Sequence, residues 1–105
     1  MDTQIKRGFL EACVLAALSK GESYGYRIIK DVPAVLELTE STLYPVLKRL
    51  EAAQAISAHS VEHNGRLRKY YGLTQTGRNQ LSTFIAEWQQ IDDIREFLFN
   101  AKESL

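Results

Sequence analysis

Hydroxyl-bearing and basic side chains are concentrated in two short stretches of the sequence, residues 41–49 and 64–69. In the first stretch, hydroxyl groups can hydrogen-bond phosphates or base edges, a proline can contact a thymine methyl group, and two cations can neutralise phosphates. Its candidate contacts are Ser41, Thr42, Tyr44, Pro45, Lys48 and Arg49. In the second stretch, the candidates that would reach the flanking backbone or minor groove are Asn64, Gly65, Arg66, Arg68 and Lys69. These residue types predict a surface that binds double-stranded DNA.

The overall charge, taken alone, argues against such a partner, because 13 basic and 13 acidic residues give a formal net charge of zero. The charge is unevenly distributed, however. Residues 1–80 contain eleven basic and eight acidic residues, a balance of +3, whereas residues 81–105 contain two basic and five acidic residues, a balance of −3. Within residues 44–80 the balance is +4. The positive charge is therefore concentrated on the part of the chain that carries the candidate contacts.

Apolar periodicity predicts three helices ahead of the second basic stretch, over residues 4–19, 24–32 and about 40–54. Pro33 is expected to end the second helix. In the third helix the spacing of Leu43, Val46, Leu47 and Leu50 predicts one buried stripe, which leaves the hydroxyl and basic side chains exposed. We expect this helix to start late, with Thr42 as its N-cap and Pro45 in its first turn. A start at Glu40 would instead make Pro45 bend the helix.

The pattern changes after residue 55 to that of a β-hairpin followed by one long helix. Residues 67–73 alternate in polarity as a strand does, residues 56–62 lack helical periodicity, and Asn64-Gly65 between them is typical of a tight hairpin turn. Thr74 is expected to cap a helix that runs to about residue 102, roughly 40 Å at 1.5 Å per residue. A single domain of this size cannot cover the whole length of such a helix.

The predicted fold is mainly α with a small β-hairpin, in the order of a winged helix-turn-helix with a long C-terminal helix. We expect residues 1–74 to form a DNA-binding domain and residues 75–105 to form a separate long helix. Its apolar side chains Leu81, Phe84, Ile85, Trp88, Ile91 and Leu98 are the candidates for a dimer or effector interface. Three interpretations of Trp88 stay open: it is part of a dimer core, it lines a cavity for a small aromatic effector, or it is exposed.

Four segments together resemble the PadR family of winged-helix transcriptional regulators: LEACVLAAL, YGYRIIKDV, LTESTLYPVLKRLE and GRLRKYYGLTQTG. The resemblance covers about residues 5–80, and the short tail resembles the compact subgroup with a single C-terminal helix. It implies a homodimeric repressor in which residues 75–105 form the dimerisation helix, often released by phenolic acids, drugs or other small effectors. A dimer of this kind is expected to bind an inverted-repeat operator. It also implies that Tyr24 and Gly25 approach a phosphate. The chain departs from the family where Gln54 replaces a glycine that serves as a left-handed C-cap.

Other classes of protein are not supported by the sequence. No set of nucleophile, base and orienting residue is recognisable and no glycine-rich phosphate loop is present, so we expect neither an enzyme nor a cofactor. The lone Cys13 is expected to be a buried, inert thiol, and His59 and His63 lack the partners of a metal site. The longest apolar stretch, around residues 12–18, is too short to span a membrane, and cytoplasmic localisation is the expectation.

Two competing functions remain open. The chain could be a winged-helix module that binds another protein and no DNA. It could also be a small-molecule-binding protein that uses a pocket at the dimer interface around Trp88.

Overall fold

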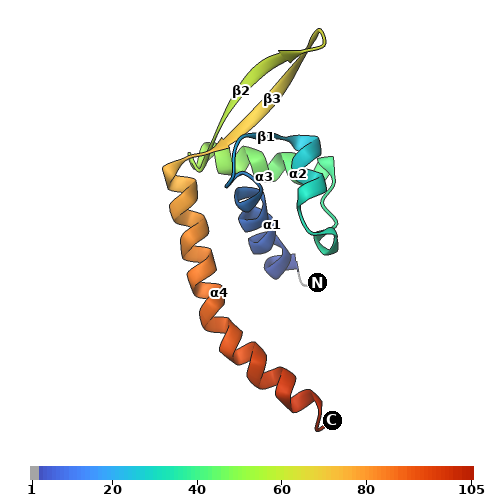
Figure 1. Ribbon diagram of the computed structural model, residues 1–105, viewed down its shortest axis with the longest axis vertical. Helices are drawn as coiled ribbons and strands as arrows, with labels where there is room; N and C mark the ends of the chain where they lie inside the picture. The colour runs from blue at the N-terminus through green and yellow to red at the C-terminus, as the bar shows by residue number, and fades with distance from the viewer. Residues whose placement is uncertain (1–2) are drawn as a thin grey trace.

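The computed structural model of the protein describes residues 3–105. The elements follow one another along the chain as α1 (Thr3–Ala17), β1 (Ser23–Tyr24), α2 (Gly25–Asp31), the 3₁₀ turn η1 (Ala34–Leu36), α3 (Glu40–Ala52), β2 (Ile56–His63), β3 (Arg66–Leu73) and α4 (Gln75–Lys102). Helices α1, α2 and α3 form the body of the molecule, and the β2–β3 hairpin, which we call the wing, projects from one end (Figure 1). Helix α4 runs alongside α1 and extends past it to the opposite end. This arrangement confirms the predicted winged helix-turn-helix with a long C-terminal helix.

The core lies where α1, α2 and α3 meet. Its fully buried side chains come from all three helices and the turn after α1, and comprise Val14, Leu15, Leu18, Ile28, Leu43 and Leu47. Val46 and Leu50 are 2% exposed, so the predicted apolar stripe of the third helix is confirmed. Each such side chain stabilises the fold by about 1.5–3 kcal/mol relative to an exposed one. Because this stripe is fixed in the core, the opposite face of α3 is held toward solvent.

Helix α3 begins at Glu40, so the expected start with Thr42 as N-cap and Pro45 in the first turn is wrong. Thr39 is extended (φ −120°, ψ 170°), and its carbonyl accepts the N–H groups of Thr42 at 3.2 Å and Leu43 at 2.8 Å. Pro45 therefore lies inside the helix, where it has no N–H to donate to the Ser41 carbonyl. Ser41 is exposed, so water can take the place of the missing donor.

The sheet has three strands in the order β1-β3-β2, all antiparallel. Asn64 (φ 51°) and Gly65 (φ 77°) both have positive φ, as a two-residue type I′ turn requires, which confirms the predicted hairpin. Strand β1 was not predicted, and the expectation that Tyr24 is helical is wrong. Tyr24 is extended (φ −132°, ψ 164°) because its backbone pairs with Tyr70 of β3, so α2 starts one residue later.

A Schellman motif ends α3 and turns the chain into the wing. The N–H of Ala55 donates to the Leu50 carbonyl and the N–H of Gln54 donates to the Glu51 carbonyl, both at 2.9 Å. Gln54 has φ 61°, which is the left-handed conformation that the family's glycine at this position implied. A non-glycine residue is therefore strained at this position.

Thr74 and Gly77 join the end of α3 to the start of α4. The Thr74 hydroxyl donates to the Gln54 carbonyl at 2.6 Å and accepts the Gly77 N–H at 3.1 Å, which confirms Thr74 as the N-cap of α4. A Cβ atom on Gly77 would overlap the Ala55 carbonyl oxygen and approach Leu73 Cδ1 to 2.7 Å. Glycine is thus required at residue 77 for α4 to leave the domain at this angle.

We predict that Gln54→Gly stabilises the protein by about 0.5–1 kcal/mol, because relief of left-handed strain outweighs the extra freedom of glycine in the unfolded chain. The midpoint of urea denaturation should rise at constant slope, measured at one fixed protein concentration. Gln80→Gly is the matched control. Gln80 is exposed inside α4, where the same substitution should destabilise by about 0.5–1 kcal/mol. Destabilisation by Gln54→Gly would contradict the assignment of strain.

Candidate nucleic-acid interface

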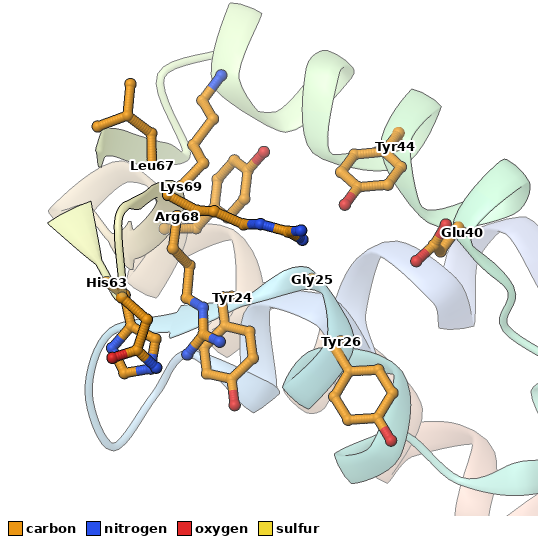
Figure 2. A pocket seen from close by; sticks show the side chains of 12 residues that line it. Tyr24, Gly25, Tyr26, Glu40, Tyr44, His63, Leu67, Arg68 and Lys69 are labelled. Atoms are coloured by element: carbon orange, nitrogen blue, oxygen red, sulfur yellow. The ribbon is translucent and has the colours of Figure 1, made fainter. Parts of the chain in front are cut away.

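An open groove of about 750 Å³ separates the N-terminal ends of α2 and α3 from the wing (Figure 2). We call it the α3–wing groove. Its lining residues are Tyr24, Gly25, Tyr26, Glu40, Tyr44, His63, Asn64, Arg66, Leu67, Arg68, Lys69 and Tyr71. The lining combines three cations with four tyrosines, which is the combination that binds phosphates and packs against sugars and bases.

Two of the three groove cations, Arg68 and Lys69, lie over aromatic rings. The Arg68 guanidinium carbon lies 4.2 Å from the centre of the Tyr24 ring, and Lys69 Nζ lies 5.7 Å from the centre of the Tyr71 ring. Such contacts attract a cation to the ring face while leaving its N–H groups able to donate elsewhere. Tyr24 in turn packs edge-to-face on Tyr70, with ring centres 5.6 Å apart. The β1–β3 pairing therefore positions Arg68 through Tyr24.

Close packing of α2 against α3 brings the Tyr44 side chain to the groove. A Cβ atom on Gly25 would lie 2.9 Å from the Tyr44 hydroxyl oxygen and 3.6 Å from Leu43 Cδ2. Only glycine at residue 25 lets the start of α2 approach α3 this closely without displacing the Tyr44 ring. Tyr44 is nevertheless half exposed, so its hydroxyl remains available to a ligand.

The remaining candidates on α3 lie outside the groove lining. The Thr39 hydroxyl oxygen lies 3.1 Å from that of Ser41 and 2.9 Å from that of Thr42, so three hydroxyls cluster at the first turn of the helix. Pro45 and Lys48 are exposed further along α3. Arg49 lies on the side that faces α1, where its Nε donates to Glu11 Oε1 at 3.3 Å.

On the wing, the structure brings four of the five candidates to the groove. Asn64, Arg66, Arg68 and Lys69 line it, whereas Gly65 lies at the exposed tip. Lys69 Nζ also lies 3.9 Å from Glu51 Oε1 at the end of α3, which links the wing to that helix.

Sequence reasoning did not identify five lining residues: Tyr26, Glu40, His63, Leu67 and Tyr71. Glu40 was missed because the helix was expected to start at Thr42. Once α3 begins at Glu40, Glu40 and Tyr44 are four residues apart and share one face, which is the signal that could have found Glu40. Tyr71 is only 4% exposed, and burial raises the pKa of its hydroxyl, so it serves mainly as support for Lys69.

A second cluster of aromatic side chains lies between α1 and α4, away from the groove. Phe9 packs edge-to-face on Phe84 (5.5 Å between ring centres) and on Trp88 (4.6 Å). These rings border a cavity of about 250 Å³ that extends to Ile91, and Trp88 is 41% exposed beside it. Farther along α4 the exposed apolar side chains are Ile94, Phe97, Leu98 and Phe99, and Leu105 is exposed after the helix ends.

The other candidate sites show no concentration of functional groups. Burial raises the pKa of the Cys13 thiol, which disfavours the reactive thiolate. His59 Nδ1 lies 3.0 Å from Glu22 Oε2, and residues 3–105 contain no group of three potential metal ligands. Within the same residues, no helix has the length and apolarity needed to cross a membrane.

Three kinds of comparison find relatives of this chain. The model of the transcriptional regulator PadR-like family matches residues 14–83. An uncharacterized protein from Lysinibacillus sphaericus is 30% identical over 106 residues, covering 96% of this chain and 97% of that protein. The crystal structure of smu.1704 from Streptococcus mutans is 42% identical with a TM-score of 0.76, over 86% of this chain and 89% of that one.

A PadR family transcription regulator from Clostridium difficile is also similar in structure. It is 33% identical with a TM-score of 0.74, and the match covers 86% of this chain and 98% of that chain. The match to the family model begins at the end of α1 and spans α2, α3, the wing and the first turns of α4, so it includes every residue that lines the groove. The chain belongs to the PadR family of winged-helix, DNA-binding transcriptional regulators.

Proposed function

We propose that the protein is a homodimeric repressor that binds an inverted-repeat operator through the α3–wing groove. PadR regulators bind DNA and typically dimerise. The observation that carries the proposal is the groove itself, in which the first turn of α3 faces three wing cations across a space open to solvent. The exposed face of α3 fits a major groove, while the wing contacts the adjacent backbone. Binding to chromosomal DNA would place this activity in the cytoplasm.

The proposed contacts come from the groove and from the exposed face of α3 beside it. Arg66, Arg68 and Lys69 neutralise phosphates, and Lys48 adds a cation on the exposed face of α3. Ser41, Thr42 and Tyr44 offer hydroxyl groups to base edges or phosphates at the first turns of the helix. Arg49, paired with Glu11, would contribute less to DNA binding than Lys48.

We predict that the triple variant with alanine at Arg66, Arg68 and Lys69 loses at least about tenfold in DNA affinity. The slope of log affinity against log salt concentration should fall by about 0.9 for each phosphate that the wing no longer neutralises. Fluorescence anisotropy with fragments selected from the source genome measures both quantities.

The control for this experiment removes three positive charges elsewhere. Alanine replaces Arg7, Lys20 and Arg27, which are exposed, do not line the groove and lie outside α4. The control variant should retain most of the wild-type affinity. An equal loss in both variants would show that binding responds to total charge, and the wing would have no special part in it.

Helix α4 is the proposed dimerisation element. Beyond the segment packed on α1, its apolar side chains are largely exposed: Phe97 is 76% and Leu98 is 61% exposed. Residues 75–105 are thus proposed as the dimerisation helix and residues 1–74 as the DNA-binding domain, with the first turns of α4 packed on that domain. Pairing of two α4 helices would fix the separation of the two α3 helices and hence the spacing of the half-sites.

We predict that Leu98→Asp raises the dissociation constant of the dimer at least about tenfold, because two-fold symmetry places the unpaired carboxylate in the interface twice. Sedimentation equilibrium measures the change. Asn100→Asp adds the same charge two residues away, on a different face of the helix, and should leave the dimer nearly unchanged. Identical behaviour of the two variants would contradict a dimer interface at Leu98.

A small aromatic effector is proposed to bind near the Phe9, Phe84 and Trp88 rings. The cavity of about 250 Å³ in one chain is smaller than most small-molecule sites, so the second protomer would complete it. Leu81, Ile85 and Ile91 lie on the same helix and would form the surrounding apolar surface. A ligand there would change the angle between the α4 helices and separate the α3 helices from their half-sites.

We predict saturable quenching of the fluorescence of Trp88, the only tryptophan of the chain, by planar phenolic compounds. Such compounds should also weaken operator binding. Trp88→Ala should abolish the heat of binding in calorimetry while DNA affinity without ligand persists. A broad panel of planar aromatics that produces neither quenching nor heat would contradict the effector site.

A further inference from the structure

Glu40 is the only carboxylate among the residues that line the α3–wing groove. It lies in the first turn of α3, and its carboxyl group points into the groove on the same side as Tyr44 (Figure 2). In helix-turn-helix proteins this first part of the recognition helix is the part that reaches base edges. A carboxylate at that place repels the phosphates of DNA, so phosphate binding does not explain its presence in the groove.

No cation of the protein neutralises Glu40 within the described part of the chain. The Arg68 guanidinium lies over the Tyr24 ring, and Lys69 lies beside Glu51 and over the Tyr71 ring. The ion pairs of residues 3–105 involve other carboxylates, at Glu11, Glu22, Glu51 and Asp92. When DNA fills the groove and displaces water, the Glu40 carboxylate must find a hydrogen-bond donor or bear the cost of desolvation.

The donors available in a major groove are few. Only the N4 amino group of cytosine and the N6 amino group of adenine donate there, whereas guanine and thymine present acceptors. Adenine also carries its N7 acceptor next to N6, and a carboxylate would be repelled by that lone pair. Cytosine presents its amino group with no acceptor of its own beside it. A carboxylate thus favours cytosine over each of the other three bases.

We propose that Glu40 is a specificity-determining residue that accepts a hydrogen bond from the N4 amino group of one cytosine in each operator half-site. This inference rests on the proposed DNA-binding role of the α3–wing groove, and it specifies one base pair that the groove recognises. Its second function, stabilising the positive end of the α3 dipole, is compatible with that contact, because one carboxylate can accept several hydrogen bonds.

The test is selection of bound sequences from a randomised DNA library by the dimeric full-length protein and by two variants. Glu40→Gln replaces a pure acceptor by an amide, which pairs well with adenine through N6 and N7. At one position of each half-site, the wild type should select cytosine and Glu40→Gln should select adenine, with the cytosine-to-adenine affinity ratio changing at least about fivefold. Glu40→Asp keeps the charge and should keep the cytosine preference with weaker binding.

The matched control is Glu37→Gln, which removes an exposed carboxylate three residues before α3 and outside the groove lining. It should leave every base preference unchanged, and thermal unfolding should show all variants folded. Unchanged preferences in Glu40→Gln, or an equal gain of affinity for every sequence, would overturn the assignment of Glu40 alone. A wild-type protein that enriches no DNA sequence would overturn the proposed function and this inference with it.

Discussion

The hydrogen bond from the Thr74 hydroxyl to the Gln54 carbonyl joins the three functional parts of the molecule at one point. Gln54 follows the end of α3, Thr74 is the N-cap of α4, and the whole wing lies between these two residues in the sequence. The Thr74 N–H adds a second link to the Ala55 carbonyl at 3.2 Å, and Gly77 lets the first turn of α4 lie directly on that carbonyl. The angle between α3 and α4 is therefore fixed by the Thr74 side chain and by backbone groups within a few residues of it. A dimer built on α4 inherits that angle in both of its α3 helices.

The groove depends on the same principle of short, local constraints. The buried stripe of α3 determines which face of the helix is exposed, and the two-residue strand β1 determines where Tyr24 and its bound Arg68 lie. Gly25 removes the side chain that would keep α2 from Tyr44. The cations and hydroxyl groups of the groove are held in place while they remain exposed to water, so they lose their hydration only when a ligand binds.

The sequence predicts the regular parts of this structure well, since the stripe of Leu43, Val46, Leu47 and Leu50 and the Asn64-Gly65 turn depend on local spacing alone. The start of α3 could not be predicted, because it depends on whether water can replace the donor that Pro45 lacks. Strand β1 could not be predicted for a different reason. Tyr24 is extended because it pairs with Tyr70, which is 46 positions later in the sequence. A contact between distant residues also explains Arg49: its ion pair with Glu11 of α1 could not be predicted from local spacing, and it distinguishes Arg49 from the cations that face the groove.

The separation of charge along the molecule affects its approach to DNA. The wing and the free end of α4 lie at opposite ends of a molecule 60 Å long, with an excess of +4 over residues 44–80 and of −3 over residues 81–105. A body with zero net charge feels no net pull in a uniform field, but such a dipole experiences a torque. At physiological salt the field of DNA extends only about 8 Å, so the torque acts at close range. Encounters in which the wing meets the duplex are therefore favoured, and those led by the acidic end of α4 are disfavoured.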